Sequence, residues 1–345
     1  MKKCIVLTLL LLTFVGIVSA KEEEPVTKND PPKMREAYEY LVLEAKNPTV
    51  ALINEAGFLM IKGRHDEAIE KYREALALAP NETLILDNLA WTLILTGRYP
   101  EALEHLKKSI ALDPKKPSTN FYLGVAYWML DDPKNAEIYL RVAATLDPNH
   151  PYSHYYLSKA FLKEGNFKDA LFEGELTAYI LDDAKIWNPD IALYLGDLYG
   201  RLEIFQKAIL QYQKLVDEKD YAFDANYGLG IAYGNFGDFE KAETHLNMAL
   251  DLNKNDPRVY YALGKLYSER DSKLKKALDY AQKALKYEPE SGRFLYLAGW
   301  ISYRMNDTKG ALIYMKKALA VDPENANYRY QVKVLEDEIA GKDNK

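Results

Sequence analysis

The chain has 345 residues, of which 28% are charged, with a net charge of −6 at pH 7 and one cysteine, Cys4. The acidic balance disfavours nucleic acid as a partner, because phosphate backbones are bound by basic surfaces. One cysteine permits no internal disulfide, so a folded region of this length has to be stabilised by burial of apolar side chains.

Residues 1–20 predict a signal peptide. Lys2 and Lys3 precede an apolar run from Ile5 to Val18, and small residues lead to a cleavage site after Ala20. The run is shorter than the roughly 20 apolar residues of a spanning helix, so we expect no transmembrane segment after signal removal. We therefore expect a periplasmic or secreted protein. The paired lysines favour bacterial export, and a eukaryotic secretory route stays open.

Two segments follow the predicted signal. Residues 21–32 are charged and contain proline, which is typical of a flexible leader. Residues 33–48 place Met34, Tyr38 and Leu41 on one side of a helix. We expect this segment to form an N-terminal capping helix that shields the exposed end of a helical array.

The segment 49–325 repeats with a period of about 34 residues. The prolines at 80, 114 and 148 are 34 residues apart, as are those at 289 and 323. Alanine recurs at a similar interval, and a small residue lies twelve or thirteen positions before each alanine. The eight pairs are Ala56 and Ala68, Ala90 and Ala102, Gly124 and Ala136, Ser158 and Ala170, Gly196 and Ala208, Gly230 and Ala242, Gly264 and Ala277, and Gly299 and Ala311.

Each unit predicts two helices joined by a short turn. Apolar residues recur at helical spacing on both sides of a break that often contains glycine, as at Gly63, Gly97, Gly165 and Gly237. The small residues are expected where the two helices approach closely, so Gly230 should lie in a helix contact. We expect units at 49–82, 83–116, 117–150, 151–184, 189–222, 223–256, 257–291 and 292–325, and a capping helix and tail over 326–345.

The stretch 226–242 contains Gly228, Gly230, Gly234 and Gly237, which raises the alternative of a nucleotide-binding loop. A dinucleotide loop needs a preceding strand and a helix that opens after its last glycine. This stretch instead matches predicted helices of the sister units. The glycines therefore predict helix packing, and we expect no nucleotide cofactor.

His150 and His154 have the four-residue spacing of a metal-binding pair. Pro151 suits the first position of a helix, however, and would leave His150 outside that helix. No third ligand is evident nearby, so we expect no metal site.

Sequence motifs of metalloproteases, serine hydrolases and P-loop enzymes are absent from the chain. The paired acids at Asp131 and Asp132, and at Asp182 and Asp183, fall at predicted turns, where such residues cap helices. Carboxylates from distant repeats can still converge in a folded chain. On balance we expect no enzymatic activity.

The repeat resembles the tetratricopeptide repeat. Small residues stand at the eighth and twentieth positions, proline near the thirty-second, and tyrosine at the eleventh, as at Tyr127, Tyr199, Tyr233 and Tyr267. The resemblance covers about 49–325 and implies an all-α, right-handed superhelical solenoid of about eight helix hairpins. The fourth unit departs from the pattern at Gly174 and Asp182, and the eighth at Ser302.

The resemblance also implies a candidate binding surface. In this family the first helix of each unit lines a concave groove, and its second, fifth, ninth, twelfth and thirteenth positions usually face a ligand. The candidates are Trp91, Phe121, Trp128 and Tyr155 near the N-terminal end, and Arg258, Tyr261, Arg293, Tyr296, Trp300, Tyr303 and Arg304 near the C-terminal end. An aromatic ring at such a position can also pack against the next repeat.

We expect the protein to be a scaffold or adaptor of the cell envelope that binds a protein or peptide in the groove. The N-terminal wall would suit apolar side chains of a partner, and the arginines would suit carboxylates or stacked rings. The alternative is a receptor for a small ligand or glycan that stacks on Tyr296, Trp300 and Tyr303. The family's carboxylate clamp is not implied, because Ile53 and Gly57 occupy its Lys and Asn positions.

Overall fold

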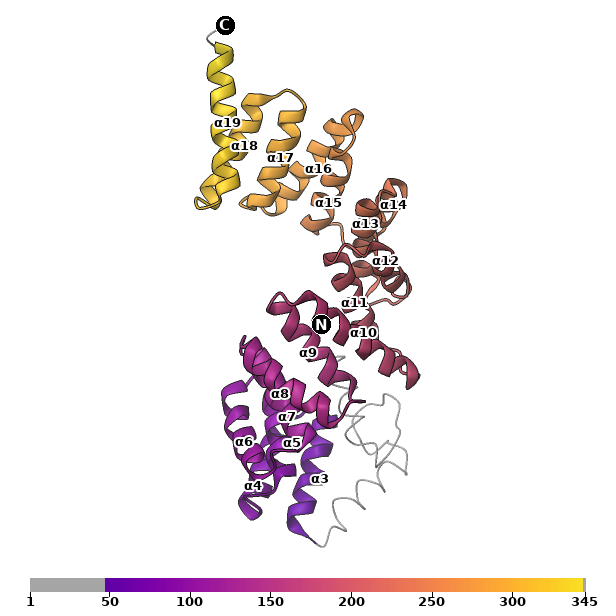
Figure 1. The fold of residues 1–345 in the computed structure, drawn as a ribbon, viewed down its shortest axis with the longest axis vertical. Coiled ribbons are helices and arrows are strands. Elements are labelled where there is room, and N and C mark those ends of the chain that lie inside the picture. Colours follow the sequence, from indigo (N-terminus) through magenta and orange to yellow (C-terminus); the bar gives the residue numbers. More distant parts are fainter. Residues whose placement is uncertain (1–46, 344–345) are drawn as a thin grey trace. The chain divides into compact units, whose positions relative to one another are not determined.

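A computed structural model describes residues 47–343 (Figure 1). These residues form seventeen α-helices, one short 3₁₀ helix and no strand, which confirms the all-α prediction. The predicted signal peptide, the leader and residues 33–46 of the predicted capping helix lie outside the described residues. The helices belong to two compact units: unit 1 ends at Trp187 and unit 2 begins at Asn188.

Unit 1 is a stack of four helix pairs, in each of which we name the first helix A and the second B. The pairs are α3 (Pro48–Ile61) with α4 (His65–Leu78), α5 (Thr83–Leu95) with α6 (Tyr99–Leu112), α7 (Pro117–Met129) with α8 (Pro133–Leu146), and α9 (Pro151–Lys163) with α10 (Phe167–Asp183). Each B helix except α10 also packs against the A helix of the next pair in this unit. Consecutive A helices from α5 to α9 contact each other.

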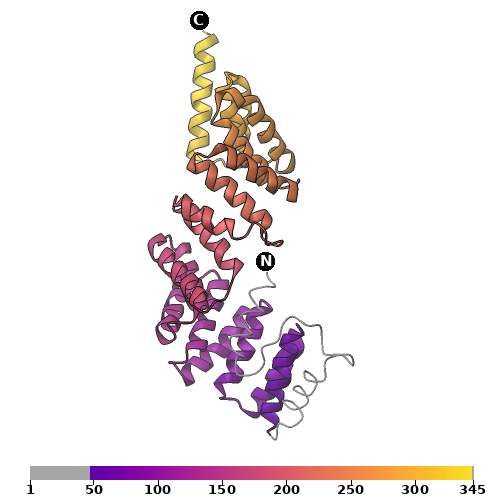
Figure 2. The same cartoon turned by 90° about the vertical axis from the view of Figure 1, so that its right-hand side faces the viewer.

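Unit 2 continues the same arrangement within itself. Its pairs are α11 (Pro189–Arg201) with α12 (Phe205–Gln213), α13 (Ala222–Phe236) with α14 (Phe239–Leu252), α15 (Pro257–Ser268) with α16 (Leu274–Tyr287), and α17 (Gly292–Arg304) with α18 (Thr308–Val321). The 3₁₀ helix η1 (Asp271–Lys273) lies in the turn between α15 and α16. The final helix α19 (Ala326–Asp343) packs against α18 and covers the end of the unit (Figure 2).

The turn inside a pair requires a left-handed residue where the A helix ends. Gly63, Gly97, Gly165 and Gly237 occupy this position with φ of 70, 80, 77 and 95°. Their predicted role as turn residues is confirmed, since this conformation costs glycine little. Asp131, Glu203 and Asn306 adopt the same conformation in pairs that lack glycine there, with φ of 64, 59 and 65°. The hairpin geometry is thus kept even where the favoured residue is missing.

Small residues allow the helices of a pair to approach closely. The eight periodic alanines are fully buried, with 0% of each exposed: Ala68, Ala102, Ala136, Ala170, Ala208, Ala242, Ala277 and Ala311. A Cβ atom built at Gly230 would lie 2.5 Å from Cγ of Leu246 on the facing helix. At Gly124 the corresponding distance to Cγ of Leu140 is 2.4 Å. The close contact predicted at Gly230 is therefore present.

Two helices depart from the usual length. α10 has 17 residues, because Asp182 stands where most units have a proline that would end the helix. α12 has only nine residues. The ring of Tyr212 in α12 lies close to both Gly196 of α11 and Gly228 of α13, where a Cβ atom would come within 2.6 and 2.5 Å of it. Glycine at these two positions thus makes room for a buried aromatic ring.

His154 joins the two helices of the fourth pair. It is 6% exposed, its Nδ1 lies 2.6 Å from Oε2 of Glu173 in α10, and its Nε2 lies 3.0 Å from the carbonyl oxygen of Pro148. Burial alone lowers the pKa of His154, but the hydrogen bonds to Glu173 and Pro148 outweigh burial and raise the pKa. Both ring nitrogens face acceptors, so the geometry favours the protonated imidazolium.

Within the part of the chain that the structure describes, no helix is both long and apolar enough to cross a membrane.

The contact at Gly230 predicts the effect of one methyl group. We expect Gly230→Ala to lower the free energy of unfolding by about 1–3 kcal/mol, because the new Cβ has to displace Leu246. Urea denaturation would measure the loss. The matched control is Gly341→Ala, where a Cβ meets no atom within 4 Å. Equal stability changes in the two variants would contradict the close-packing account.

The His154–Glu173 contact predicts a dependence of stability on pH. Because folding raises the pKa of His154, its contribution is complete below the unfolded pKa and is lost as pH rises through the folded pKa. We expect this loss on the alkaline side of pH about 6.5, the ordinary value for histidine.

Melting temperatures of the wild type and Glu173→Gln, measured across this range, would test the prediction. The wild-type advantage should shrink with rising pH. Burial lowers the pKa of the neighbouring His150, which acts in the opposite direction, but its effect is common to both proteins. An advantage that stays constant or grows with pH would count against the assignment.

Candidate functional site

The candidate residues all lie on A helices, in two groups that belong to different units. Unit 1 holds Trp91 on α5, Phe121 and Trp128 on α7, and Tyr155 on α9. Unit 2 holds Arg258 and Tyr261 on α15, and Arg293, Tyr296, Trp300, Tyr303 and Arg304 on α17.

Three of the unit 1 candidates are buried. Trp91, Phe121 and Tyr155 are 8, 3 and 5% exposed. The ring of Trp91 stacks on Tyr122 with centroids 5.0 Å apart, and Phe121 meets Tyr156 edge-on at 6.0 Å. These rings pack against rings on the same or the next A helix, which is the alternative that the sequence left open.

Trp128 is the least buried of the four. Its indole meets Tyr156 edge-on at 5.6 Å, and the ammonium of Lys159 lies 4.4 Å from the indole centroid. Its Nε1 is buried and has no hydrogen-bond acceptor among residues 47–343. A buried indole donor without an acceptor carries a free-energy cost, so this position is less favourable for folding than its neighbours.

In unit 2, arginines alternate with tyrosines along successive A helices. We name Tyr227, Arg258, Tyr261, Arg293 and Tyr296 the arginine–tyrosine row. The Cζ atom of Arg258 lies 5.3 Å from the ring centroid of Tyr227 on the preceding A helix. Cζ of Arg293 lies 5.6 Å from the ring of Tyr261, again one A helix earlier. Each arginine thus makes a cation–π contact with the preceding repeat.

The two arginines of the row differ in their partners. Arg258 donates from Nη2 to Oδ2 of Asp256 at 2.7 Å and from Nε to Oδ1 at 3.0 Å. Burial would raise the pKa of the Asp256 carboxyl, but the hydrogen bonds from Arg258 outweigh burial and lower it. Arg293 is exposed and has no carboxylate partner within 4.0 Å among the described side chains. Its charge is therefore available to a ligand.

The three rings proposed for a stacking site do not form one platform. Tyr296 stacks on Tyr328 of α19, with centroids 5.6 Å apart. Trp300 and Tyr303 lie together, with centroids 6.3 Å apart and ring planes tilted by 33°. They are 40 and 39% exposed, which is unusual for such large rings.

Arg304 is held inside unit 2. Its guanidinium donates to the backbone carbonyl of Ser268, the last residue of α15, and to the carboxylate of Asp271 in η1. It is half-buried, and its hydrogen bonds close the C-terminal end of α15. This placement gives Arg304 a structural role in the turn.

The sequence interpretation missed Tyr227 and Asp224 of α13, and Asp197 of α11. Tyr227 stands at the fifth position of its unit, like Tyr261 and Tyr296, so the same rule applied to the sixth unit would have found it. Phe223, which stacks on Tyr227 with centroids 6.5 Å apart, carries no such signal in the repeat pattern.

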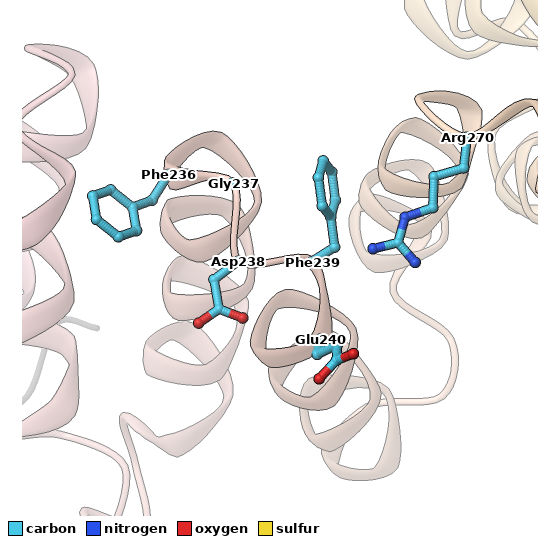
Figure 3. Close-up of a pocket in the computed structure, with 6 residues that line it drawn as sticks. All are labelled: Phe236, Gly237, Asp238, Phe239, Glu240 and Arg270. Carbon is cyan, nitrogen blue, oxygen red and sulfur yellow. The ribbon is translucent and has the colours of Figure 1, made fainter.

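A shallow cavity of about 430 Å³ lies at the turn between α13 and α14 (Figure 3). Phe236, Asp238, Phe239 and Glu240 line it together with Gly237 and Arg270, whose Cζ lies 4.7 Å from the ring of Phe239. The glycine-rich stretch 226–242 covers most of α13, the turn at Gly237 and the start of α14. No strand precedes it in the described chain, so the nucleotide-loop interpretation is excluded.

The histidine pair does not form a metal site. His150 caps the N-terminus of α9, where its Nδ1 accepts from the backbone N–H of Ser153 at 3.2 Å, while His154 pairs with Glu173. Across residues 47–343, no group of three or more His, Cys, Asp or Glu side chains is placed to hold a metal ion.

Comparison with known proteins locates the same repeats. Two sequence models of the tetratricopeptide repeat family match the chain, one at residues 49–115 and the other at 88–151, 193–257 and 261–326. A segment of 96 residues is 29% identical to anaphase-promoting complex subunit 3 of Schizosaccharomyces pombe, covering 28% of this chain and 14% of that protein.

A segment of 143 residues is 29% identical to BBSome complex member BBS4 of Bos taurus, covering 40% of this chain and 26% of the relative. The chain thus spans about a quarter or less of the length of these curated relatives.

Two solved structures share the fold. The APC/C hetero-tetramer Cut9–Hcn1 superposes with a TM-score of 0.54 at 18% identity, over 88% of this chain and 59% of that one. The C-terminal part of a repeat-containing protein from Cytophaga hutchinsonii gives a TM-score of 0.53 at 21% identity, over 71% and 99% of the two chains. The chain belongs to the tetratricopeptide repeat family, whose members generally act as scaffolds for interactions between proteins.

Proposed function

We propose that the protein is a non-enzymatic scaffold or adaptor of the cell envelope that binds a partner polypeptide on the A-helix face of unit 2. The observation that carries this proposal is the surface of α17. Arg293, Trp300 and Tyr303 are all exposed there, and Arg293 lacks an acidic partner among the described residues.

Exposed aromatic rings on the same helix as an arginine without an acidic partner favour protein recognition. Burial of a large exposed ring by a partner is favourable in free energy. Trp, Tyr and Arg are also the residues most enriched at binding hot spots. The cation–π contact between Arg293 and Tyr261 holds the guanidinium in place before binding. A partner would therefore meet a partly ordered surface, which reduces the entropy lost on association.

A scaffold role agrees with the local roles of the acidic residues. Asp132 caps the N-terminus of α8 by accepting from the backbone N–H of Asn135 at 3.2 Å, as the turn position suggested. The prediction for Asp182 and Asp183 is wrong, because they are the last two residues of α10, which no proline ends earlier. Proteins with this repeat and fold are typically non-enzymatic. We accordingly propose recognition, and no catalysed reaction, as the activity.

The envelope location rests on the sequence of residues 1–20, with its paired lysines, apolar run and small residues before Lys21. An adaptor in this compartment would work without disulfides, because Cys4 would leave with the signal peptide.

A receptor for a glycan or small ligand is the second candidate. The exposed pair Trp300 and Tyr303 favours it, because exposed aromatic rings can stack on a ring of a ligand. Tyr296 is already stacked on Tyr328, so such a site would have two available rings. Melting-temperature shifts with simple sugars, lost in Trp300→Ala, would favour this candidate over the scaffold.

The binding face can be tested with matched pairs of exposed rings. We expect Trp300→Ala combined with Tyr303→Ala to reduce capture of the native partner at least tenfold, as for loss of about 1.4 kcal/mol or more at a hot spot. Crosslinking in the native envelope followed by quantitative pull-down would measure this.

The control is Phe172→Ala combined with Tyr179→Ala on α10, whose side chains are 63 and 69% exposed. Equal capture by both double variants, with unchanged melting temperatures, would contradict the proposed face.

The location can be tested by N-terminal sequencing. After expression of the full chain in a bacterial host, we expect the periplasmic fraction to contain a protein that begins at Lys21. A cytoplasmic product that retains residues 1–20 would contradict the export proposal and leave the binding face to be tested separately.

A further inference from the structure

The second positions of the repeats in unit 2 carry charges whose sign changes once along the chain. The second position of four consecutive repeat units is occupied by Asp190 on α11, Asp224 on α13, Arg258 on α15 and Arg293 on α17. Consecutive members of this series lie on A helices that contact each other. Two acidic positions are thus followed by two basic ones.

The side chains near the change of sign face one another. Arg258 lies over Tyr227 of α13, as described above. Burial raises the pKa of Tyr227, and the charges of Arg258 and Arg293 both act on its hydroxyl to lower it. Tyr227 on α13 therefore lies between the acidic second positions on α11 and α13, which we name the acidic half, and the basic ones on α15 and α17, which we name the basic half.

Asp197 of α11 extends the acidic half. It accepts a hydrogen bond of 2.7 Å from the hydroxyl of Tyr212. Burial raises the pKa of the Asp197 carboxyl, the bond from Tyr212 and the charge of Arg201 lower it, and the carboxylate of Asp224 raises it further. Asp197 is thus influenced both by the negative charge of Asp224 on the next A helix and by the positive charge of Arg201 on its own helix.

These charges are only partly neutralised within the protein. Asp224 and Arg293 have no ion-pair partner among the described residues, whereas Arg258 is paired with Asp256. At the second positions of the units, each sign occupies two neighbouring helices, although Arg201 also lies in the acidic half and Asp256 in the basic half. A face of this kind favours a ligand that carries the opposite arrangement.

We propose that the partner binds as an extended segment with a fixed direction, its acidic residues on Arg258 and Arg293 and its basic residues on Asp197 and Asp224. This inference rests on the proposed function and adds the chemistry of the partner. Arg293 suits the acidic half of the segment, because its planar guanidinium can bind a carboxylate through two hydrogen bonds, whereas Arg258 already binds Asp256 in this way and contributes mainly its charge.

The spacing of the helices sets the spacing of the partner's charges. Neighbouring packed helices lie about 8–10 Å apart, so α11 to α17 span about 24–30 Å. An extended chain rises about 3.3 Å per residue, which gives a segment of about eight residues. Carboxylates that contact Arg258 and Arg293 would stand about three residues apart.

The test is selection of binders from a phage-displayed library of random twelve-residue peptides on the immobilised chain. Bound peptides should be enriched in Asp and Glu in one half and in Lys and Arg in the other. Arg293→Glu should weaken binding of the selected peptides at least about tenfold and replace acidic by basic residues on reselection. Arg293 is exposed, so this variant should fold, as its melting temperature would verify.

Lys309→Glu makes the same change of charge on the exposed surface of α18 and should leave the selected peptides bound as before. Peptides that depend on Trp300 and Tyr303 but show no separation of charge would overturn the fixed direction and leave the proposed function standing. Failure to select any peptide that depends on this face would overturn both.

Discussion

The whole structure depends on close contact between the helices of each pair, which only small side chains permit. The eight periodic alanines are completely buried, and glycines such as Gly124 and Gly230 leave no space for a single additional carbon atom. A helix pair has too little apolar surface to be stable alone, so each pair is stabilised by its neighbours in the stack. The A helices are consequently held in a regular series, and equivalent positions recur from one repeat to the next.

Because of this regularity, residues at equivalent positions of successive A helices form rows. Once the second and fifth positions of each A helix lie in register, a tyrosine in one repeat meets an arginine in the following one, as Tyr227 meets Arg258 and Tyr261 meets Arg293. Cation–π contacts order both arginines. Arg258 also donates hydrogen bonds to Asp256, whereas Arg293 has no carboxylate partner among the described residues. The repeat stack thus orders the side chains that we propose bind the partner.

The sequence predicted the repeat, its two helices and the turn glycines, because each depends on local spacing. It did not settle which rings are buried. Trp91 and Trp300 occupy equivalent positions in their units, yet Trp91 is 8% exposed and Trp300 40%. The difference arises from neighbouring repeats. Trp91 stacks on Tyr122 of the next A helix, whereas the ring that Trp300 meets within residues 47–343 is Tyr303 of its own helix. Arg304 likewise pairs with Ser268 and Asp271, 36 and 33 residues away in the chain, and no local pattern indicates such partners.

Site-specific photocrosslinking tests most directly whether recognition occurs on the A-helix face. A photoreactive phenylalanine analogue would replace either Trp300 on α17 or Ile313 on α18, a residue that is 57% exposed. The account predicts that the native partner forms a covalent adduct from position 300 and little or none from position 313. Adducts that form from position 313 alone would place recognition on the B helices and contradict it.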